Sequence, residues 1–128
     1  MKRLVVFIAL CCSLMMVKSQ VPETYKGPEI KFDKVVHDFG DVKLDSKVSV
    51  EFVFTNIGKS PLIIEEVISS CDCTVAEAPK TPIMPGKTGI IKVSYSAENL
   101  GLISKRVTVI SNALTDRITL QIKGKTVE

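Results

Sequence analysis

The chain has 128 residues, with 17 Lys plus Arg against 14 Asp plus Glu, one His and no Trp. Three of the 17 basic residues and no acid lie in residues 1–19, so residues 20–128 carry 14 charges of each sign and are formally neutral. A formally neutral chain is not expected to display the basic face and high pI typical of nucleic-acid binding. A length of 109 residues (128 less 19) is that of one domain.

Residues 1–19 have the pattern of a secretory signal. Two basic residues precede the uncharged apolar run 4–17, and Val17 and Ser19 stand at positions −3 and −1 of a cut before Gln20. The run is shorter than the roughly 20 apolar residues that a membrane span needs. We therefore expect cleavage between Ser19 and Gln20, and an exported protein, periplasmic or secreted, with no membrane span after cleavage.

A lipid anchor is an alternative, because Cys11 and Cys12 lie in the same apolar run. A lipid-attachment site has a small residue before the modified cysteine, whereas Leu10 precedes Cys11 here. Attachment at either cysteine would also leave an apolar region at the short end of the expected range. A cleaved signal is therefore the favoured interpretation.

Residues 20–28 contain two prolines and a glycine and are interpreted as an N-terminal linker. In the predicted domain, residues 29–128, apolar side chains alternate with polar ones at a period of two, and no helical stripe lasts three turns. At most one short helical turn is expected, at 97–100. The short β-rich segments are separated by turn residues and are expected at 32–39, 48–54, 61–64, 91–95, 103–109 and 118–122.

This pattern predicts an all-β fold, an antiparallel β-sandwich of about seven strands. An antibody-type domain is excluded because the chain lacks Trp and a widely spaced cysteine pair. Glycines at 40 and 58 are expected to take positive φ. Asn56 is expected to fold its amide onto the turn backbone, and Pro85-Gly86 fits the corner of a type II turn.

Six motifs in one order suggest a family: HDFGDV (37–42), FTNIGKSPLII (54–64), SSCDCT (69–74), PGKTGIIKVSY (85–95), KRVTVISN (105–112) and LQIKGK (120–125). Together they closely resemble the bacterial domain-of-unknown-function family 1573 (DUF1573), which is related to Hydin-type and major-sperm-protein-type domains. The resemblance covers about residues 30–126. It implies an exported immunoglobulin-like sandwich with no established enzymatic activity. Members often have glycine between the two cysteines, where this chain has Asp72.

Cys71 and Cys73 are the cysteines that remain after cleavage. In an extended strand their Cα atoms would be roughly 6.5–7 Å apart, at the upper limit for a disulfide, so a bridge requires a bent backbone. A local structural disulfide or a packed thiol pair is the favoured interpretation. A redox-active pair is an alternative. The charge of Asp72 disfavours thiolate, unless Lys80 or Lys87 offsets it.

A metal site is a further alternative. The thiolates of Cys71 and Cys73 would favour Cu(I) or Zn(II), with Met84 and His37 as the candidates for additional ligands. A turn position is the commoner role for His37, and packing against the core is the commoner role for Met84. We therefore expect no cofactor, with Cu or Zn as the alternative.

No catalytic residues are expected, because the chain has no GxSxG, HExxH or glycine-rich phosphate motif. The adjacent Glu65 and Glu66 would point to opposite faces of a strand. The sequence favours a non-catalytic module of unknown specific role, which acts in protein interaction or as a structural component of the envelope. An unidentified envelope or extracellular protein is the expected partner, and the first and last strands, near 30–36 and 117–123, are the candidate binding edges. The alternative is a periplasmic metal or thiol-redox accessory protein.

Overall fold

The computed structural model describes residues 22–128. The predicted signal segment, its cleavage between Ser19 and Gln20, and the lipidation sites Cys11 and Cys12 lie outside the described residues. Within 22–128 every regular element is a strand, and no helix that could cross a membrane is present. The strands are β1 (Ile30–Phe32), β2 (Val36–Lys43), β3 (Lys47–Asn56), β4 (Ile64–Ser69), β5 (Thr74–Glu77), β6 (Thr88–Ser96), β7 (Gly101–Ser111) and β8 (Arg117–Val127).

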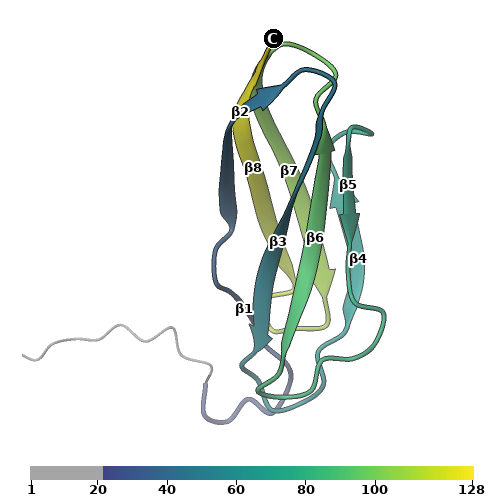
Figure 1. Cartoon of the computed structure of the whole chain (residues 1–128). Helices are drawn as coiled ribbons and strands as arrows, with labels where there is room; N and C mark the ends of the chain where they lie inside the picture. Colours follow the sequence, from purple (N-terminus) through teal and green to yellow (C-terminus); the bar gives the residue numbers. More distant parts are fainter. Residues whose placement is uncertain (1–21) are drawn as a thin grey trace, which may run out of the picture.

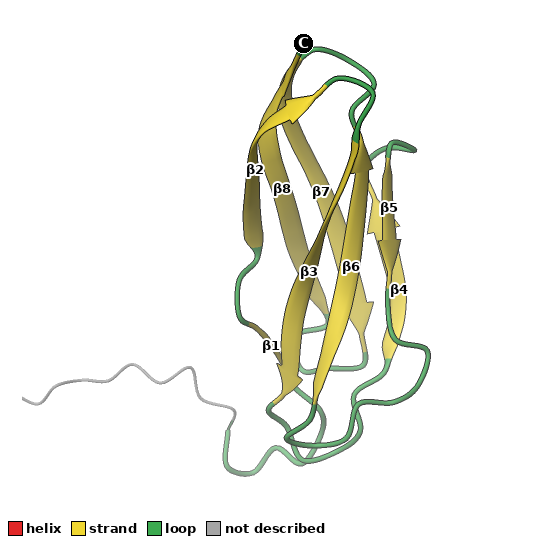
Figure 2. Ribbon diagram, viewed as in Figure 1, coloured by secondary structure: helices red, strands yellow, loops and turns green. Residues whose placement is uncertain are grey.

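The strands form two four-stranded sheets that pack face to face (Figures 1 and 2). The first sheet has the order β1-β3-β6-β5 and the second has the order β2-β8-β7-β4. The predicted all-β sandwich is confirmed, with eight strands rather than about seven. The predicted first strand is divided between the two sheets, as β1 and β2. In addition, β5 lies in a segment that has too few alternating residues to be recognised.

One pairing is parallel, in contrast to the antiparallel sandwich expected. After β1 the chain crosses to the second sheet and continues as β2, which pairs with β8 from Val36↔Gln121 to Lys43↔Val127. The prediction that the last strand is a free edge is therefore wrong, because β8 lies between β2 and β7. The edge strands are β1 and β5 in the first sheet and β2 and β4 in the second.

The core lies between the sheets and consists of the alternating apolar residues expected from the sequence. Phe52, Phe54 and Ile91 are fully buried. Burying each such side chain contributes roughly 1.5–3 kcal/mol. The other buried apolar side chains of this core are Ile30, Val42, Val50, Leu62, Ile83, Val93, Tyr95, Ala97, Ile103, Val107, Val109, Ala113, Leu120 and Ile122.

A buried amide organises the end of the sandwich where β3 ends and β6 begins. Asn56 is fully buried, and its Nδ2 donates to the carbonyls of Ser60 (2.8 Å) and Ile83 (2.9 Å). Its Oδ1 accepts from the backbone N–H groups of Gly58 (2.9 Å) and Glu29 (3.4 Å). The expected bond to the turn backbone is therefore present, together with bonds to two other segments.

Two of the predicted turn glycines have positive φ, and one does not. Gly40 has φ 68° and Gly86 has φ 80°. The N–H of Lys87 donates to the carbonyl of Met84 at 3.0 Å, as a type II turn requires. Gly58 does not have positive φ. It must be glycine because a Cβ there would lie 2.4 Å from the backbone nitrogen of Glu29.

The segment assigned to a linker is attached to the sandwich over its described part. The N–H of Lys59 donates to the carbonyl of Gly27 at 2.9 Å, and that of Leu114 donates to the carbonyl of Pro28 at 3.0 Å. The hydroxyl of Ser60 donates to the carbonyl of Lys26. Residues 26–28 therefore belong structurally to the domain.

Candidate functional site at the Cys71–Cys73 corner and the β5 edge

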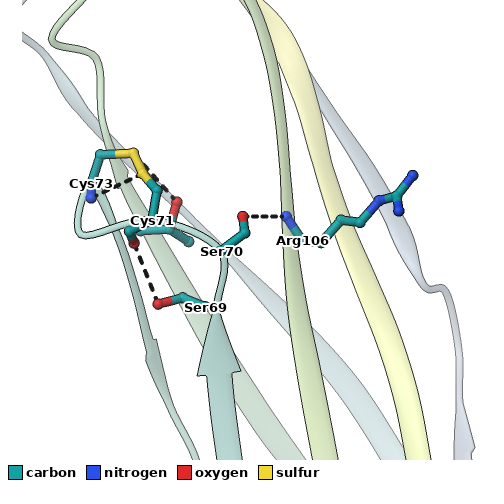
Figure 3. The surroundings of a disulfide bond; sticks show 6 residues. Ser69, Ser70, Cys71, Cys73 and Arg106 are labelled. Carbon is teal, nitrogen blue, oxygen red and sulfur yellow. Dashed lines mark hydrogen bonds between the residues drawn. A yellow bond between two sulfur atoms is a disulfide. The ribbon is translucent and has the colours of Figure 1, made fainter.

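The two cysteines lie where the chain passes from β4 of the second sheet to β5 of the first. The structure joins Cys71 and Cys73 by a disulfide with a Cα–Cα distance of 5.4 Å (Figure 3). The backbone bends between them, and the N–H of Thr74 donates to the carbonyl of Cys71 at 3.2 Å. This bend is the one that the sequence argument required, and it places the Cα distance within the ordinary range for disulfides.

Backbone bonds attach this corner to both sheets. The N–H of Ser70 donates to the carbonyl of Arg106 on β7 at 3.0 Å, and the N–H of Arg106 donates to the hydroxyl of Ser70 at 3.1 Å. On the other side, the N–H of Ser96 on β6 donates to the carbonyl of Cys73 at 2.9 Å. The Arg106 side chain itself points away from the disulfide (Figure 3).

The disulfide therefore adds little to an attachment that the backbone already makes. Loop-closure entropy for a ring of three residues stabilises a folded chain by about 1.5 kcal/mol, compared with about 4.7 kcal/mol for a 100-residue loop. Stabilisation of the fold alone therefore does not explain a bridge that closes a ring of only three residues.

The two sulfur atoms have different neighbours. The N–H of Cys73 donates to Sγ of Cys71 at 3.1 Å, whereas Sγ of Cys73 has only the distant hydroxyl of Thr74, at 3.9 Å. Both cysteines are half-buried. The donated N–H stabilises negative charge on Cys71 more than the distant hydroxyl stabilises it on Cys73.

The disulfide borders a hollow of about 330 Å³. Leu100 and Leu102 flank Gly101 at the start of β7 and are 53% and 89% exposed. Exposed large apolar side chains in a group are more informative than single ones. The residues that line the hollow are Cys71, Asp72, Cys73, Tyr95, Ser96, Glu98, Asn99, Leu100, Leu102 and Lys105.

The cation beside the cysteines is not one of those predicted. Lys80 lines a different hollow, with Glu65 and Glu66, and Lys87 precedes β6, at the end of that strand away from Cys73. Lys105 lines the hollow of the disulfide. No sequence signal could have identified it, because only the pairing of β4 with β7 brings it there.

The adjacent glutamates differ from expectation. The β4–β7 register shifts between Ile64 and Glu66, and both Glu65 and Glu66 are exposed. The irregularity at Glu65 changes the simple alternation of strand faces.

The four candidate metal ligands are not brought together. Met84 precedes β6, whereas Cys73 bonds to the last residue of that strand, a separation of about 25 Å along the strand. His37 is on β2, three strand spacings from β4, or about 14 Å. The structure therefore does not assemble the alternative metal set of Cys71, Cys73, Met84 and His37. Residues 22–128 contain no group of three or more His, Cys, Asp and Glu side chains that could hold an ion.

His37 instead takes part in a small local cluster. Lys34 Nζ lies 2.8 Å from His37 Nδ1, and the imidazole ring packs edge-on against Phe39 with centroids 4.7 Å apart. Partial burial lowers the pKa of His37 below its usual 6.5, and the charge of Lys34 lowers it further against the opposing effect of Asp38. The neutral ring that accepts a hydrogen bond from Lys34 is therefore favoured.

The β5 edge has free backbone groups. Because the N–H of Ser96 bonds to the carbonyl of Cys73, the antiparallel alternation directs the backbone groups of Val75 toward β6 and those of Thr74 and Ala76 away from it. The N–H of Thr74 is already bonded to the carbonyl of Cys71, so the free groups are the carbonyl of Thr74 and both groups of Ala76. The β5–β6 register is unbroken over all four residues of β5. Val75 is 52% exposed.

The other three edges are modified. β1 has three residues, and the N–H of its first, Ile30, donates to Oε1 of Glu29 at 2.9 Å. The carboxylate of Glu29 also accepts from the N–H and the hydroxyl of Thr115, so a loop of the second sheet covers the start of β1. β2 and β4 each have an irregular register. Bulges and covering loops are devices that hinder edge pairing.

Comparison with known proteins identifies the family and the fold. A family model described as "Protein of unknown function (DUF1573)" matches residues 30–126. No curated protein matches the chain. A protein of unknown function from Porphyromonas gingivalis W83 is similar in structure, with 17% identity and a TM-score of 0.69 over 78% of this chain and 47% of that one.

Two further solved structures are similar. The ASH/PapD-like domain 7 of human CEP192 has 9% identity and a TM-score of 0.68, over 88% of this chain and 94% of that one. The VesB protease of Vibrio cholerae has 20% identity and a TM-score of 0.65, over 77% of this chain and 32% of that one. The chain thus spans about half of the P. gingivalis protein and about a third of VesB. At these identities the likeness concerns the fold alone.

Proposed function

The chain belongs to the DUF1573 family of proteins of unknown function, and from its fold we propose that it is an exported, non-catalytic module that binds an extended segment of a partner protein. The observation that carries the proposal is the edge of β5. Its register is unbroken, the carbonyl of Thr74 and both backbone groups of Ala76 are free and point away from β6, and Val75 is half exposed. An extended segment can add to such an edge through main-chain hydrogen bonds.

The corner at Cys71–Cys73 supports this role. It is bonded to β7 through Ser70 and to β6 through Cys73, so the first residue of β5 is held in place before a partner binds. An edge that is ordered in advance loses less conformational entropy on binding. We infer that the partner is an envelope or extracellular protein, because the N-terminal pattern is that of an export signal.

Ala76 allows a test that separates edge pairing from folding. In Ala76→Pro the substitution removes an N–H that points away from β6, and proline on an edge strand is tolerated where its missing N–H would face solvent. Ala76→Ser keeps this N–H and is the matched control. We expect similar thermal unfolding for both variants, with loss of partner binding only in Ala76→Pro.

The partner is identified by photo-crosslinking in the native envelope. A photoreactive amino acid replaces Val75 on β5 or, as a control, Ser49, which is exposed on the outer face of β3 in the same sheet. A crosslinked protein obtained from position 75, absent at 49, lost with Ala76→Pro and retained with Ala76→Ser supports the proposal. Equal crosslinking in the proline and serine variants would refute edge pairing.

Export has its own test. The mature chain recovered from the envelope fraction is expected to begin at Gln20 by intact mass. A mass that retains residues 1–19, or that includes an acyl chain on Cys11 or Cys12, would contradict a cleaved secretory signal.

A further inference from the structure

We propose that Cys71–Cys73 is an exchangeable disulfide that accepts two electrons from a dithiol in an exported polypeptide, held by its apolar residues against Leu100 and Leu102. This activity is independent of strand addition at β5. The inference rests on three features of the corner: the accessible bridge, the unequal neighbours of its two sulfur atoms, and the apolar rim beside it.

The bridge is open to an incoming thiol. Cys71 and Cys73 are half-buried and both border a hollow of about 330 Å³, although Cys73 also packs in part against the core. Exposed disulfides are more readily reduced than enclosed ones. The backbone bonds at Ser70 and at Cys73 hold the corner to both sheets, and they do not include the S–S bond. The disulfide can therefore open while the corner stays attached.

The neighbours of the sulfur atoms assign the direction of attack. A client thiolate attacks Sγ of Cys73, the S–S bond breaks, and Cys71 leaves as a thiolate. The N–H of Cys73, 3.1 Å from that sulfur, stabilises the charge until a proton is taken up from water. A sulfur that leaves more easily accelerates exchange.

The second half of the exchange releases the client. Its other thiolate attacks the client sulfur of the mixed disulfide, breaks the bond to Cys73, and Cys73 leaves as a thiolate that is then protonated. Two client thiols lose two protons and two electrons and become a disulfide. Cys71 and Cys73 gain both and become thiols, so a single stoichiometric exchange balances without another oxidant.

The rim of the hollow determines which client is favoured. Leu100 and Leu102 present apolar surface that an extended polypeptide with apolar residues can cover. Lys105 supplies a positive charge that attracts the incoming thiolate, against the negative charges of Asp72 and Glu98 in the same hollow.

Two synthetic dithiol peptides test the proposal. Both contain the same pair of cysteines; leucine and phenylalanine flank the pair in one, and serine and glycine flank it in the other. Peptide oxidation by the oxidised mature protein is followed without oxygen, by acid quenching, alkylation and mass spectrometry. We expect the apolar peptide to react at least tenfold faster, and the acid-quenched intermediate to be attached to Cys73.

Variants identify the groups responsible. Leu100→Ser/Leu102→Ser is expected to remove the preference for the apolar peptide. Lys105→Met is expected to slow both peptides about threefold, whereas Lys92→Met, exposed on the outer face of β6, leaves both rates unchanged. Equal rates for the two peptides, an unchanged preference in the leucine variant, or attachment to Cys71 overturns the proposal. A circular-dichroism melt of each variant verifies that it is folded.

Discussion

Replacing Asn56 by alanine is expected to be among the most damaging single polar substitutions in this domain. The side chain is fully buried and makes four hydrogen bonds to the backbone of three separate segments. In Asn56→Ala the N–H groups of Gly58 and Glu29 lose this acceptor. The carbonyl of Ile83 keeps its bond from the N–H of Leu62, at 2.8 Å.

The magnitude follows from the groups that are left without partners. Each buried polar group without a partner costs about 1–3 kcal/mol. Two such N–H groups, one of them bonded at the longer distance of 3.4 Å, give an expected loss of about 3–4 kcal/mol. Domains of this size have a free energy of unfolding of about 5–15 kcal/mol. The variant is therefore expected to be folded but much less stable.

Asn112 is the matched control. It has the same side chain and also bonds to the backbone, with Oδ1 accepting from the N–H of Ile63 at 2.7 Å and Nδ2 donating to the carbonyl of Pro61 at 3.3 Å. It is exposed, so water replaces its bonds, and Asn112→Ala is expected to cost about 1 kcal/mol or less. Urea unfolding of both variants measures the difference. Equal losses would refute the argument that burial determines the cost.

Three other substitutions test separate features. Thr126 is 2% exposed and its Oγ1 has no hydrogen-bond partner among the described residues. Thr126→Val should therefore stabilise the fold by about 1 kcal/mol, measured by urea unfolding. The control Thr119→Val, on the exposed face, should change the stability little. Gly58→Ala places a Cβ 2.4 Å from backbone atoms. It should reduce the free energy of unfolding by about 2 kcal/mol, which lowers the melting temperature by several degrees or more; an unchanged melting temperature would contradict the close approach. The pKa of His37 is lowered below 6.5, so the neutral imidazole stabilises the folded protein above pH 6.5, and this stabilisation decreases as the pH falls below that value. NMR titration of this single histidine should show its pKa rising toward 6.5 in Lys34→Met. An unchanged value would remove Lys34 as a cause.

The sequence predicted those features of the fold that depend on local alternation. Val50, Phe52 and Phe54 alternate with polar residues, and their burial follows directly from the two-residue period of a strand. Pro85-Gly86 likewise determines its own turn. These predictions succeeded because the information lies in consecutive residues.

Features that depend on long-range pairing were missed. The parallel pairing of β2 with β8 joins residues some 85 positions apart, and no local pattern in Val36–Lys43 indicates which strand lies beside it. β5 has four residues, too few for alternation to be distinguished from a loop. Nothing in the sequence around Lys105 places it beside the cysteines, because that proximity arises only when β4 pairs with β7.

The two lateral sides of the sandwich differ in a way that explains where binding and exchange are proposed. On one side the chain crosses between the sheets from β1 to β2, and Glu29 binds the loop at Thr115, so the first sheet's edge is covered there. On the other side the crossing is the short corner from β4 to β5 (Figure 1). A corner of four residues, 70–73, leaves the outward backbone groups of Ala76 free and places the disulfide beside a surface hollow. The same short connection thus leaves the β5 edge free and the bridge accessible, although strand addition and thiol exchange use different atoms and can be lost separately.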